Sequence, residues 1–230
     1  MLLYYITDRS QFSGDADSRR AQLLATVSHA ARCGVDYIQL REKDLSAHDL
    51  ELLAREIVQL RTENSKLNTG VLINTRTDIA LACGANGVHL RSDDISPAEV
   101  RAIWSHSGAG TRATIGVSCH TRAEVACAAE GGADFAVFGP VFEKYKPGGS
   151  TRPTGLEVLH EACQEKIPVI ALGGVTLENA SVCIQAGAAG IAGIRLFQEN
   201  EMGRTVMALR QLESVVGRQS SVVSKAKTDD

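Results

Sequence analysis

The feature that most constrains the fold is a pattern that occurs four times along the chain. In each copy an Ala-rich stretch ends at a glycine and a short apolar run follows; the four glycines are Gly34, Gly84, Gly132 and Gly187. Glycine just past a helix supplies the left-handed residue that ends it. The glycines are 50, 48 and 55 residues apart, so each interval has room for two strand–helix units of about 25 residues.

Four further apolar runs lie between the repeats, at 2–6, 70–73, 114–117 and 168–171. Together the eight runs lack polar alternation, which is typical of strands buried on both faces. Between them we expect helices at 18–33, 46–64, 76–83, 96–106, 121–131, 154–165, 176–186 and 199–216. Eight strands alternating with eight helices predict one α/β domain, a single (β/α)8 TIM barrel over residues 1–217.

The alternative architecture is an open, doubly wound sheet. That fold usually has fewer repeats and a GxGxxG turn, which we do not find in the sequence. The segment 218–230 is polar and lacks sustained periodicity. We therefore expect it to be a disordered tail.

Charge and apolar content exclude several classes of protein. The formal net charge of −3 gives no support for binding nucleic acid or an anionic membrane. No apolar run approaches the roughly 20 residues of a membrane-spanning helix, and the N-terminus lacks the regions of a signal peptide. The six cysteines form no CxxC pair, and we expect them to be reduced. We therefore expect a cytoplasmic protein; the sequence carries no signal for its oligomeric state.

In a barrel of this kind the functional groups follow the strands, at one rim. Gln39, Arg41 and Lys43 alternate after the second strand, so their side chains point the same way and can converge on one ligand. Arginine offers a bidentate fork and lysine a point charge, which together suit a diphosphate. The alternative is a solvated strand end in which Glu42 pairs with one of the cations.

The third and fourth strands also end in polar residues. Asn74 could bind a ligand or cap the following helix. Asp93 and Asp94 are adjacent carboxylates in a loop, and Mg²⁺ takes oxygen ligands of this kind. The alternative is a polar loop that leads to a helix cap at Ser96. His89 lies on the strand and fits a hydrogen-bonded core histidine.

The fifth strand ends at Ser118 and His120, which share a side of the strand and could face one site. His120 is the best candidate for a general acid or base because histidine exchanges protons near neutral pH, although it could simply begin the next helix. Cys119 lies between them. The loop after the sixth strand is rich in Gly and Pro, and we expect a mobile flap. Its Lys146 could reach a phosphate or stay exposed.

The last two strands end in Gly173–Gly174 and Ile194–Arg195. Barrels commonly bind phosphate at this place through backbone N–H groups, and glycine permits close approach to the backbone. Arg195 would add a bidentate cation; alternatively it is a surface residue at the start of a helix.

Taken in order, these motifs resemble the thiamine phosphate synthase family, which includes thiazole tautomerases of the TenI type. The resemblance extends from Tyr4 to about Phe197, nearly the whole expected barrel. Its matching segments are Tyr4–Asp8, Tyr37–Asp44, Val71–Ala80, Gly84–Asp94, Gly116–Thr121, Phe138–Phe142, Pro168–Val175 and Ala186–Ile194. Their order and barrel spacing make the resemblance specific.

The resemblance implies a transferase that joins an aminopyrimidine methyl diphosphate to a thiazole phosphate and releases pyrophosphate. The catalytic groups would be Ser118 and Lys146, with His120 as the acid or base of a tautomerase. Asp94, with Asp93 beside it, would bind Mg²⁺. The pyrimidine diphosphate would be held by Gln39, Arg41, Lys43, Asn74, Ser118 and Lys146, and the thiazole phosphate by Gly173 or Gly174 with Ile194 and Arg195.

Several positions depart from the family pattern. Thr75 stands where synthases have an aspartate that binds magnesium, Arg195 replaces a serine, and Arg91–Ser92 replaces Gly-Gln. The flap keeps only the lysine of a Thr-x-Thr-Lys run. These changes weaken the expectation of magnesium-assisted diphosphate loss. They leave two alternatives, a thiazole tautomerase using His120 and a non-catalytic thiamine-related binding or regulatory protein. The Gln-x-Arg-x-Lys set favours the synthase, because a tautomerase would not need it.

Overall fold

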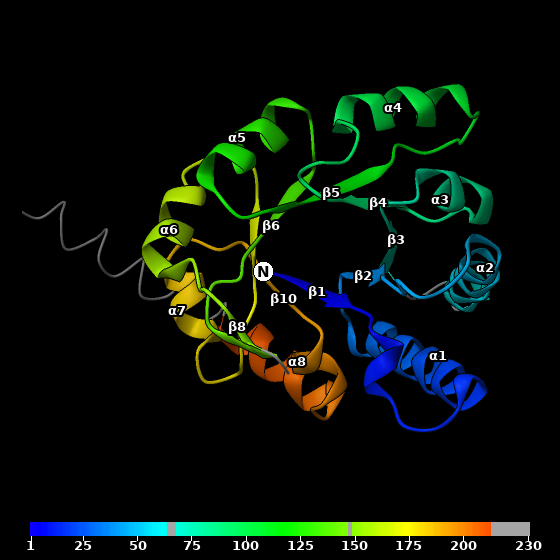
Figure 1. Cartoon of the computed structure of the whole chain (residues 1–230), viewed down its shortest axis with the longest axis horizontal. Helices are drawn as coiled ribbons and strands as arrows, with labels where there is room; N and C mark the ends of the chain where they lie inside the picture. The colour runs from blue at the N-terminus through cyan, green and yellow to red at the C-terminus, as the bar shows by residue number, and fades with distance from the viewer. Residues whose placement is uncertain (64–67, 147–148, 213–230) are drawn as a thin grey trace, which may run out of the picture.

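The computed structural model describes residues 1–63, 68–146 and 149–212, and its centre is a closed barrel of eight parallel strands (Figure 1). Neighbouring strands follow the order β1-β10-β9-β6-β5-β4-β3-β2. This confirms the predicted (β/α)8 barrel and excludes the open sheet, because β1 pairs with both β2 and β10. The strands are β1 (Leu2–Ile6), β2 (Tyr37–Leu40), β3 (Gly70–Asn74), β4 (Gly87–Leu90), β5 (Thr114–Cys119), β6 (Phe135–Phe138), β9 (Val169–Leu172) and β10 (Gly190–Gly193).

Helices surround the barrel and cover the outer faces of its strands (Figure 1). They are α1 (Ala16–Cys33), α2 (Ala47–Glu63), α3 (Thr77–Cys83), α4 (Pro97–His106), α5 (Arg122–Glu130), α6 (Gly155–Ala162), α7 (Ala180–Gln185) and α8 (Arg195–Gln198), with a 3-10 turn η1 (Arg9–Gln11). A further helix covers 202–212. Among the described residues, no helix combines the length and apolar character needed to cross a membrane.

Several predicted segments differ from the structure, among them the helix predicted at 176–186, which begins only at Ala180. The helix predicted at 199–216 is preceded by α8 and begins at 202, because the Glu201 side chain accepts the N–H groups of Gly203 and Arg204 and so caps the helix there. The flap after β6 contains an antiparallel hairpin, β7 (Lys144–Lys146) and β8 (Gly149–Thr151), where we predicted only a loop. Strands of three residues are too short to produce a recognisable alternation. The predicted tail at 218–230 lies outside the described residues.

The fourfold sequence pattern has a structural counterpart. After the capping glycine of each repeat, one residue donates its backbone N–H to a carbonyl of the preceding strand, and in three repeats its side chain also accepts that strand's N–H. These side-chain bonds join Asp36 to Leu3 (2.7 Å), Asn86 to Val71 (2.8 Å) and Asp134 to Ile115 (2.7 Å). In the fourth repeat, Ala189 keeps only the backbone bond, to Val169.

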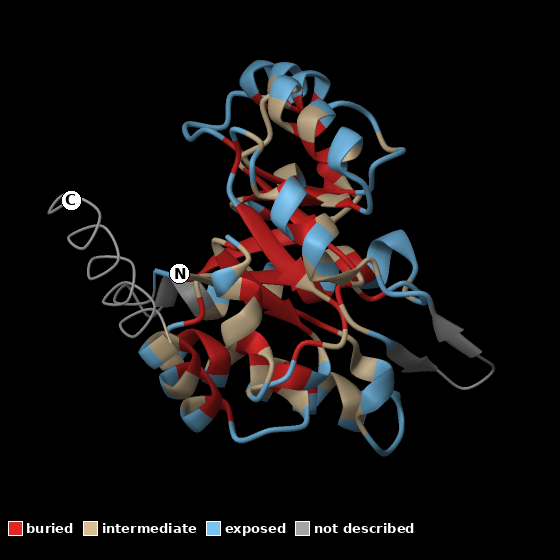
Figure 2. Cartoon of the chain, turned by 90° about the vertical axis from the view of Figure 1, so that its left-hand side faces the viewer, coloured by how far each residue is buried: buried red, intermediate tan, exposed pale blue. Residues whose placement is uncertain are grey.

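The core has two layers separated by the strands. The strands themselves are almost wholly buried, and the surrounding helices are buried in part (Figure 2). The larger layer lies between strands and helices, and the smaller one fills the barrel with Tyr4, Ile6, Leu72, Phe135, Val137, Ile170 and Ala192. Successive residues of a strand point to opposite faces, so one strand serves both layers. The interior has little spare room, since a Cβ on Gly116 would lie 2.5 Å from the Phe135 ring and 2.9 Å from His89 Nδ1.

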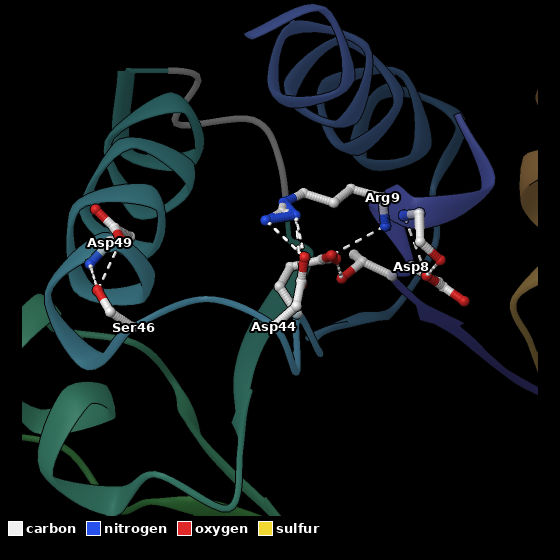
Figure 3. Close-up of polar contacts among 8 residues, drawn as sticks. Asp8, Arg9, Asp44, Ser46 and Asp49 are labelled. Carbon is white, nitrogen blue, oxygen red and sulfur yellow. Dashed lines mark hydrogen bonds and ion pairs between the residues drawn. The ribbon is translucent and has the colours of Figure 1, made fainter. Parts of the chain in front are cut away.

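Glu42 joins the ends of the first two strands. Its side chain is 5% exposed; Oε1 accepts the Thr7 hydroxyl at 2.5 Å and Oε2 accepts the Arg9 N–H at 2.9 Å. Thr7 Oγ1 in turn accepts the Arg41 N–H at 3.0 Å. The Arg9 guanidinium reaches across to Asp44 at 3.0 Å (Figure 3). These contacts hold the β1 and β2 ends together and fix the backbone that carries Arg41.

Burial raises the pKa of Glu42 above its ordinary value of 4.5, and the hydrogen bonds from Thr7 and Arg9 oppose the rise. The folded protein therefore binds this proton more tightly than the unfolded chain does. The resulting stabilisation is fully present below about pH 4.5 and is lost as the pH rises through the folded-state pKa.

We predict that Glu42→Gln removes this pH dependence, because the amide cannot ionise. The variant also turns an N–H₂ group toward Thr7 or Arg9, which costs about 1–3 kcal/mol. The free energy of unfolding of the wild type, minus that of the variant, should therefore grow as the pH falls from 7 toward 4.5. Urea titrations across this range measure it.

Glu99→Gln is the opposing control, because the Ser96 side chain and N–H hold the pKa of Glu99 below its ordinary value. Its stabilisation is present above that ordinary value and is lost as the pH falls through the folded-state pKa. The wild-type advantage over this variant should stay constant between pH 7 and about 4.5 and shrink only below that pH. The same trend for both variants would contradict the assigned role of Glu42.

Candidate active site

The carboxyl ends of β2, β3 and β5 bring Gln39, Asn74 and Ser118 to the same rim of the barrel. Gln39 is 2% exposed, and its Nε2 donates to Asn74 Oδ1 at 2.7 Å. Gln39 Oε1 is buried without a hydrogen-bond partner. Leaving such an acceptor unpaired costs about 1–3 kcal/mol, so this oxygen marks a place where a ligand can supply a donor. Asn74 is hydrogen-bonded to Gln39. It does not cap the following helix, because the N-cap of α3 is Arg76.

Ser118 is part of a chain of polar side chains that descends into the barrel. Its Oγ lies 2.8 Å from His89 Nε2, and His89 Nδ1 lies 2.9 Å from the Tyr4 hydroxyl. Burial, helped by the positive charge of Arg41, lowers the pKa of His89 to about 3. His89 is therefore a neutral, hydrogen-bonded core histidine, as its position on the strand suggested.

Arg41 and Lys43 lie on the opposite side of the strand extension from Glu42. Arg41 is half-buried and Lys43 is exposed, whereas Glu42 is buried. The two oxygens of Glu42 accept from the Thr7 hydroxyl and the Arg9 N–H, which ties this carboxylate to the end of β1. The effect of Arg41 on His89 places its positive charge near the barrel mouth.

His120 follows β5 directly and is exposed at the rim. Its Nδ1 is hydrogen-bonded to the Gly139 carbonyl after β6. Because a carbonyl can only accept, Nδ1 carries the hydrogen and the neutral ring has its lone pair on Nε2. The N-cap of α5 is Thr121, whose side chain accepts from Glu124 N–H. His120 therefore does not serve as the cap.

The carboxylates of Asp93 and Asp94 are occupied by Arg91. Asp94 Oδ2 accepts the Arg91 backbone N–H at 2.8 Å, and Oδ1 accepts its guanidinium at 3.1 Å. Asp93 lies 3.4 Å from the same guanidinium. Ser96 caps α4 with a reciprocal Glu99 bond, as the alternative reading of this loop expected. In the part of the chain that the structure describes, no three His, Cys, Asp or Glu side chains converge as a metal site.

Thr75 has a backbone conformation that is unusual for a β-branched residue. Its φ is 57°, in the left-handed region. The Arg76 N–H donates to the Asn74 carbonyl at 2.8 Å, which makes Thr75 the centre of a three-residue turn, and the Thr75 N–H donates to the His89 carbonyl. Such strain costs about 1–3 kcal/mol and tends to occur at functional sites.

The rim after β9 and β10 contains the predicted phosphate turns. Gly173 and Gly174 have φ of 97° and 66°, and a Cβ on Gly174 would lie 2.7 Å from the Glu143 carbonyl. Ile194 is the N-cap of α8, and the exposed Arg195 begins it, 3.7 Å from Glu199. Lys146 belongs to β7, but its side chain lies outside the described residues. The structure therefore brings the backbone groups of this site to one rim.

Sequence reasoning missed two supporting groups. Glu42 was interpreted as a possible surface partner of a cation, and Thr7 received no role, although together they hold the Arg41 backbone. The available signal was the alternation after β2, which places Glu42 opposite Gln39, Arg41 and Lys43. The link from Tyr4 to Ser118 joins residues 85 and 29 positions apart, and no local pattern indicates it.

Comparisons with known proteins identify the family of this chain. A family model described as thiamine monophosphate synthase matches residues 3–197. The putative thiamine-phosphate synthase of Geobacter sulfurreducens is 41% identical, over 90% of this chain and 93% of its own. The thiamine-phosphate synthase of Syntrophomonas wolfei is 36% identical, over 91% and 95%.

A solved structure of a named relative has the same fold. The thiamine phosphate pyrophosphorylase of Pyrococcus furiosus superposes with a TM-score of 0.75 at 28% identity, over 94% of this chain and 96% of its own. The family model, at residues 3–197, includes the ends of all eight barrel strands. The chain belongs to the thiamine monophosphate synthase family.

Proposed function

We propose that this protein is a thiamine phosphate synthase, which joins an aminopyrimidine methyl diphosphate to a thiazole phosphate. The observation that carries the proposal is the buried, unpaired Oε1 of Gln39 at the barrel mouth. An exocyclic amine of the pyrimidine supplies the donor that this oxygen lacks. Asn74 accepts the other end of the Gln39 amide at 2.7 Å, so the acceptor is held toward the ligand rather than free to rotate.

The diphosphate is assigned to Arg41, Lys43, Ser118 and Lys146. The C–O bond to the diphosphate breaks with both electrons leaving on oxygen, and the thiazole nitrogen attacks the resulting pyrimidine-stabilised cation to form the C–N bond. Pyrophosphate departs with the charge. The protein aligns the two reactants and stabilises the leaving group. Arg41 suits this role because its backbone is fixed by Thr7 while its charge is felt inside the mouth.

The thiazole phosphate is assigned to the turns after β9 and β10. Gly173 and Gly174 are in the left-handed region, where successive N–H groups can converge on an anion. Side chains are absent there, so phosphate can reach the backbone. Ile194 and Arg195 form the facing turn, and Arg195 adds a cation at its edge.

The residues present fit a magnesium ion that binds together with the diphosphate. They fit less well a magnesium ion held by protein ligands alone. Mg²⁺ usually takes one or two carboxylates together with substrate phosphates and water. Asp94, with Asp93 beside it, offers that number, although Arg91 already donates to Asp94. When bound, the ion would neutralise negative charge on the diphosphate.

We also propose that the protein works in the cytoplasm, on small phosphorylated substrates. All six cysteines are unpaired, which is typical of a reducing compartment. Burial raises the pKa of the Cys119 thiol beside the site to about 12. Cys119 is therefore a packing residue at neutral pH and not a nucleophile.

The direct test is incubation of the purified protein with the pyrimidine diphosphate, the thiazole phosphate and Mg²⁺, with thiamine phosphate as the readout. Gln39→Met removes the amide but keeps an unbranched side chain. We expect it to lower kcat/KM by about 10- to 100-fold, because one buried hydrogen bond to the pyrimidine is lost. Gln185→Met, at an exposed position of α7, should leave kcat/KM unchanged. Absence of product from the folded wild type would overturn the proposal.

Thr75 provides a test of the metal. Asp and Asn both tolerate the left-handed region, so Thr75→Asp and Thr75→Asn should each stabilise the fold by about 1 kcal/mol. Only Thr75→Asp adds an anionic oxygen ligand. It should lower the Mg²⁺ concentration for half-maximal synthesis several-fold, and Thr75→Asn should not. Equal shifts in the two variants would mean that strain, not ligation, sets the response.

A thiazole tautomerase is the second candidate, and the geometry of His120 favours it. Nδ1 is anchored on the Gly139 carbonyl, so Nε2 presents a lone pair at the rim. A base held in this way can remove a proton from a thiazole carboxylate phosphate and return it at another atom. This reaction requires the phosphate turns but no departing diphosphate.

For this candidate we expect His120→Asn to lower the tautomerisation rate by about 10²- to 10⁴-fold, the usual contribution of a general base. His106→Asn is the matched control, because His106 is also exposed and bonds a backbone carbonyl through Nδ1, but from α4. Tautomerisation that persists in His120→Asn would exclude this mechanism. Binding of either phosphorylated heterocycle without any turnover would instead indicate a regulatory protein.

A further inference from the structure

The chain of contacts from Tyr4 to Ser118 crosses the dry interior of the barrel. Tyr4 is fully buried among Phe135, Tyr37 and His89, and its ring meets Phe135 edge-on at 5.4 Å. The His89 ring lies between Tyr4 and Ser118 and bonds one of them through each nitrogen. Gly116 leaves the space for this ring, because a Cβ there would lie 2.9 Å from Nδ1. The fold therefore reserves room for His89.

Counting hydrogens fixes the direction of the chain. The Tyr4 hydroxyl lies in an apolar layer, where an unused O–H would be costly, and His89 Nδ1 is the group within reach to accept it. Tyr4 therefore donates to Nδ1. Burial holds His89 in the neutral form with its pKa at about 3, and a neutral imidazole carries one N–H. That hydrogen is on Nε2 and is donated to Ser118 Oγ.

Ser118 Oγ thus accepts a hydrogen bond from His89 Nε2, and the Ser118 hydroxyl hydrogen must point away from His89. Ser118 is half-buried at the mouth, so the direction left for this hydrogen is toward the ligand. With the opposite tautomer, Ser118 would donate to His89 and present only lone pairs. An anion such as a diphosphate has only hydrogen-bond acceptors. It can therefore bond to Ser118 in the first arrangement, where the hydroxyl hydrogen points to the ligand, but not in the second.

We propose that His89 is a positioning residue that, with Tyr4, holds the Ser118 hydroxyl as a hydrogen-bond donor to the departing diphosphate. The inference rests on the proposed function, since it needs a diphosphate beside Ser118. It adds a role for two buried residues that do not touch the substrate. This chain of hydrogen bonds from Tyr4 through His89 to Ser118, called the relay below, favours ligands that present a hydrogen-bond acceptor to Ser118 and disfavours those that present a donor.

The tautomer is measured directly by nitrogen-15 NMR of the histidine rings in the full chain, with the His89 signals assigned by their loss in His89→Gln. The wild type should show the hydrogen on Nε2. Tyr4→Phe removes the donor to Nδ1 and keeps the ring, so the His89 signals should shift toward a mixture of tautomers. A hydrogen on Nδ1 in the wild type would overturn the proposal, whatever the enzyme's activity.

The functional consequence is measured by calorimetric binding of inorganic pyrophosphate with Mg²⁺. Ser118→Ala should weaken binding roughly tenfold, the effect of losing one hydrogen bond to a charged group. Tyr4→Phe should weaken it about three- to tenfold. The double variant should bind no more weakly than Ser118→Ala alone, because the Tyr4 effect passes through Ser118.

Tyr5→Phe is the matched control. Tyr5 is the next residue of β1 and is equally buried, but its hydroxyl has no partner and its ring packs on Phe197 in the outer layer. It should leave pyrophosphate binding and the His89 tautomer unchanged. Thermal unfolding of every variant verifies that the fold is retained.

The outcomes separate the two proposals. If Ser118→Ala weakens binding and Tyr4→Phe does not, or if their effects add, the relay is wrong and the synthase proposal stands. If Ser118→Ala binds normally, the relay fails, and turnover by the wild type decides whether the synthase proposal fails with it. A reduced kcat in Tyr4→Phe with an unchanged KM for thiazole phosphate supports a role at the departing diphosphate.

Discussion

Closure of the parallel ladder is the constraint on which the rest of this structure depends. Because β1 pairs with β10 as well as β2, no strand of the barrel has a free edge, and all eight carboxyl ends meet at one rim. Residues from distant parts of the chain, such as Gln39 and Asn74, then become neighbours at 2.7 Å. The same closure leaves a narrow interior, which is filled by aliphatic side chains and a few rings, with glycine where a ring needs the space. The closed pairing of the strands therefore determines both the geometry of the site and the packing of the core.

Burial separates the polar groups at this rim into two kinds. Glu42 and His89 are enclosed, and their pKa values move in the directions that favour their neutral forms. Neither group contacts solvent enough to meet a substrate, so each can act only through its hydrogen-bond partners. Glu42 acts through Thr7 on the backbone of Arg41, and His89 bonds Ser118. Charged groups at the exposed surface, such as Arg91 and Asp93, pair with one another instead and are individually worth little.

Much of the fold could be predicted because its signals are local and repeated. A capping glycine followed by an apolar run identifies strand and helix without knowledge of partners, and it recurs often enough to indicate a closed barrel. The hairpin at β7 and β8 was missed because three-residue strands have no readable period. The final helix was placed too early because Glu201 caps it through its side chain. Both errors concern chain ends and loops, where tertiary contacts outweigh propensity.

The sequence by itself determined the order of strands and helices, the parity of each strand and therefore which residues could face the mouth. The alternation of side chains along a strand, together with the position at each strand's carboxyl end, was sufficient to name Gln39, Arg41, Asn74 and Ser118. Only the tertiary structure decided how these groups are held. The burial of Glu42, the left-handed turn at Thr75 and the line from Tyr4 through His89 to Ser118 depend on residues far apart in the chain. Hydrogen-bond direction and pKa respond to three-dimensional surroundings, which one-dimensional spacing does not contain.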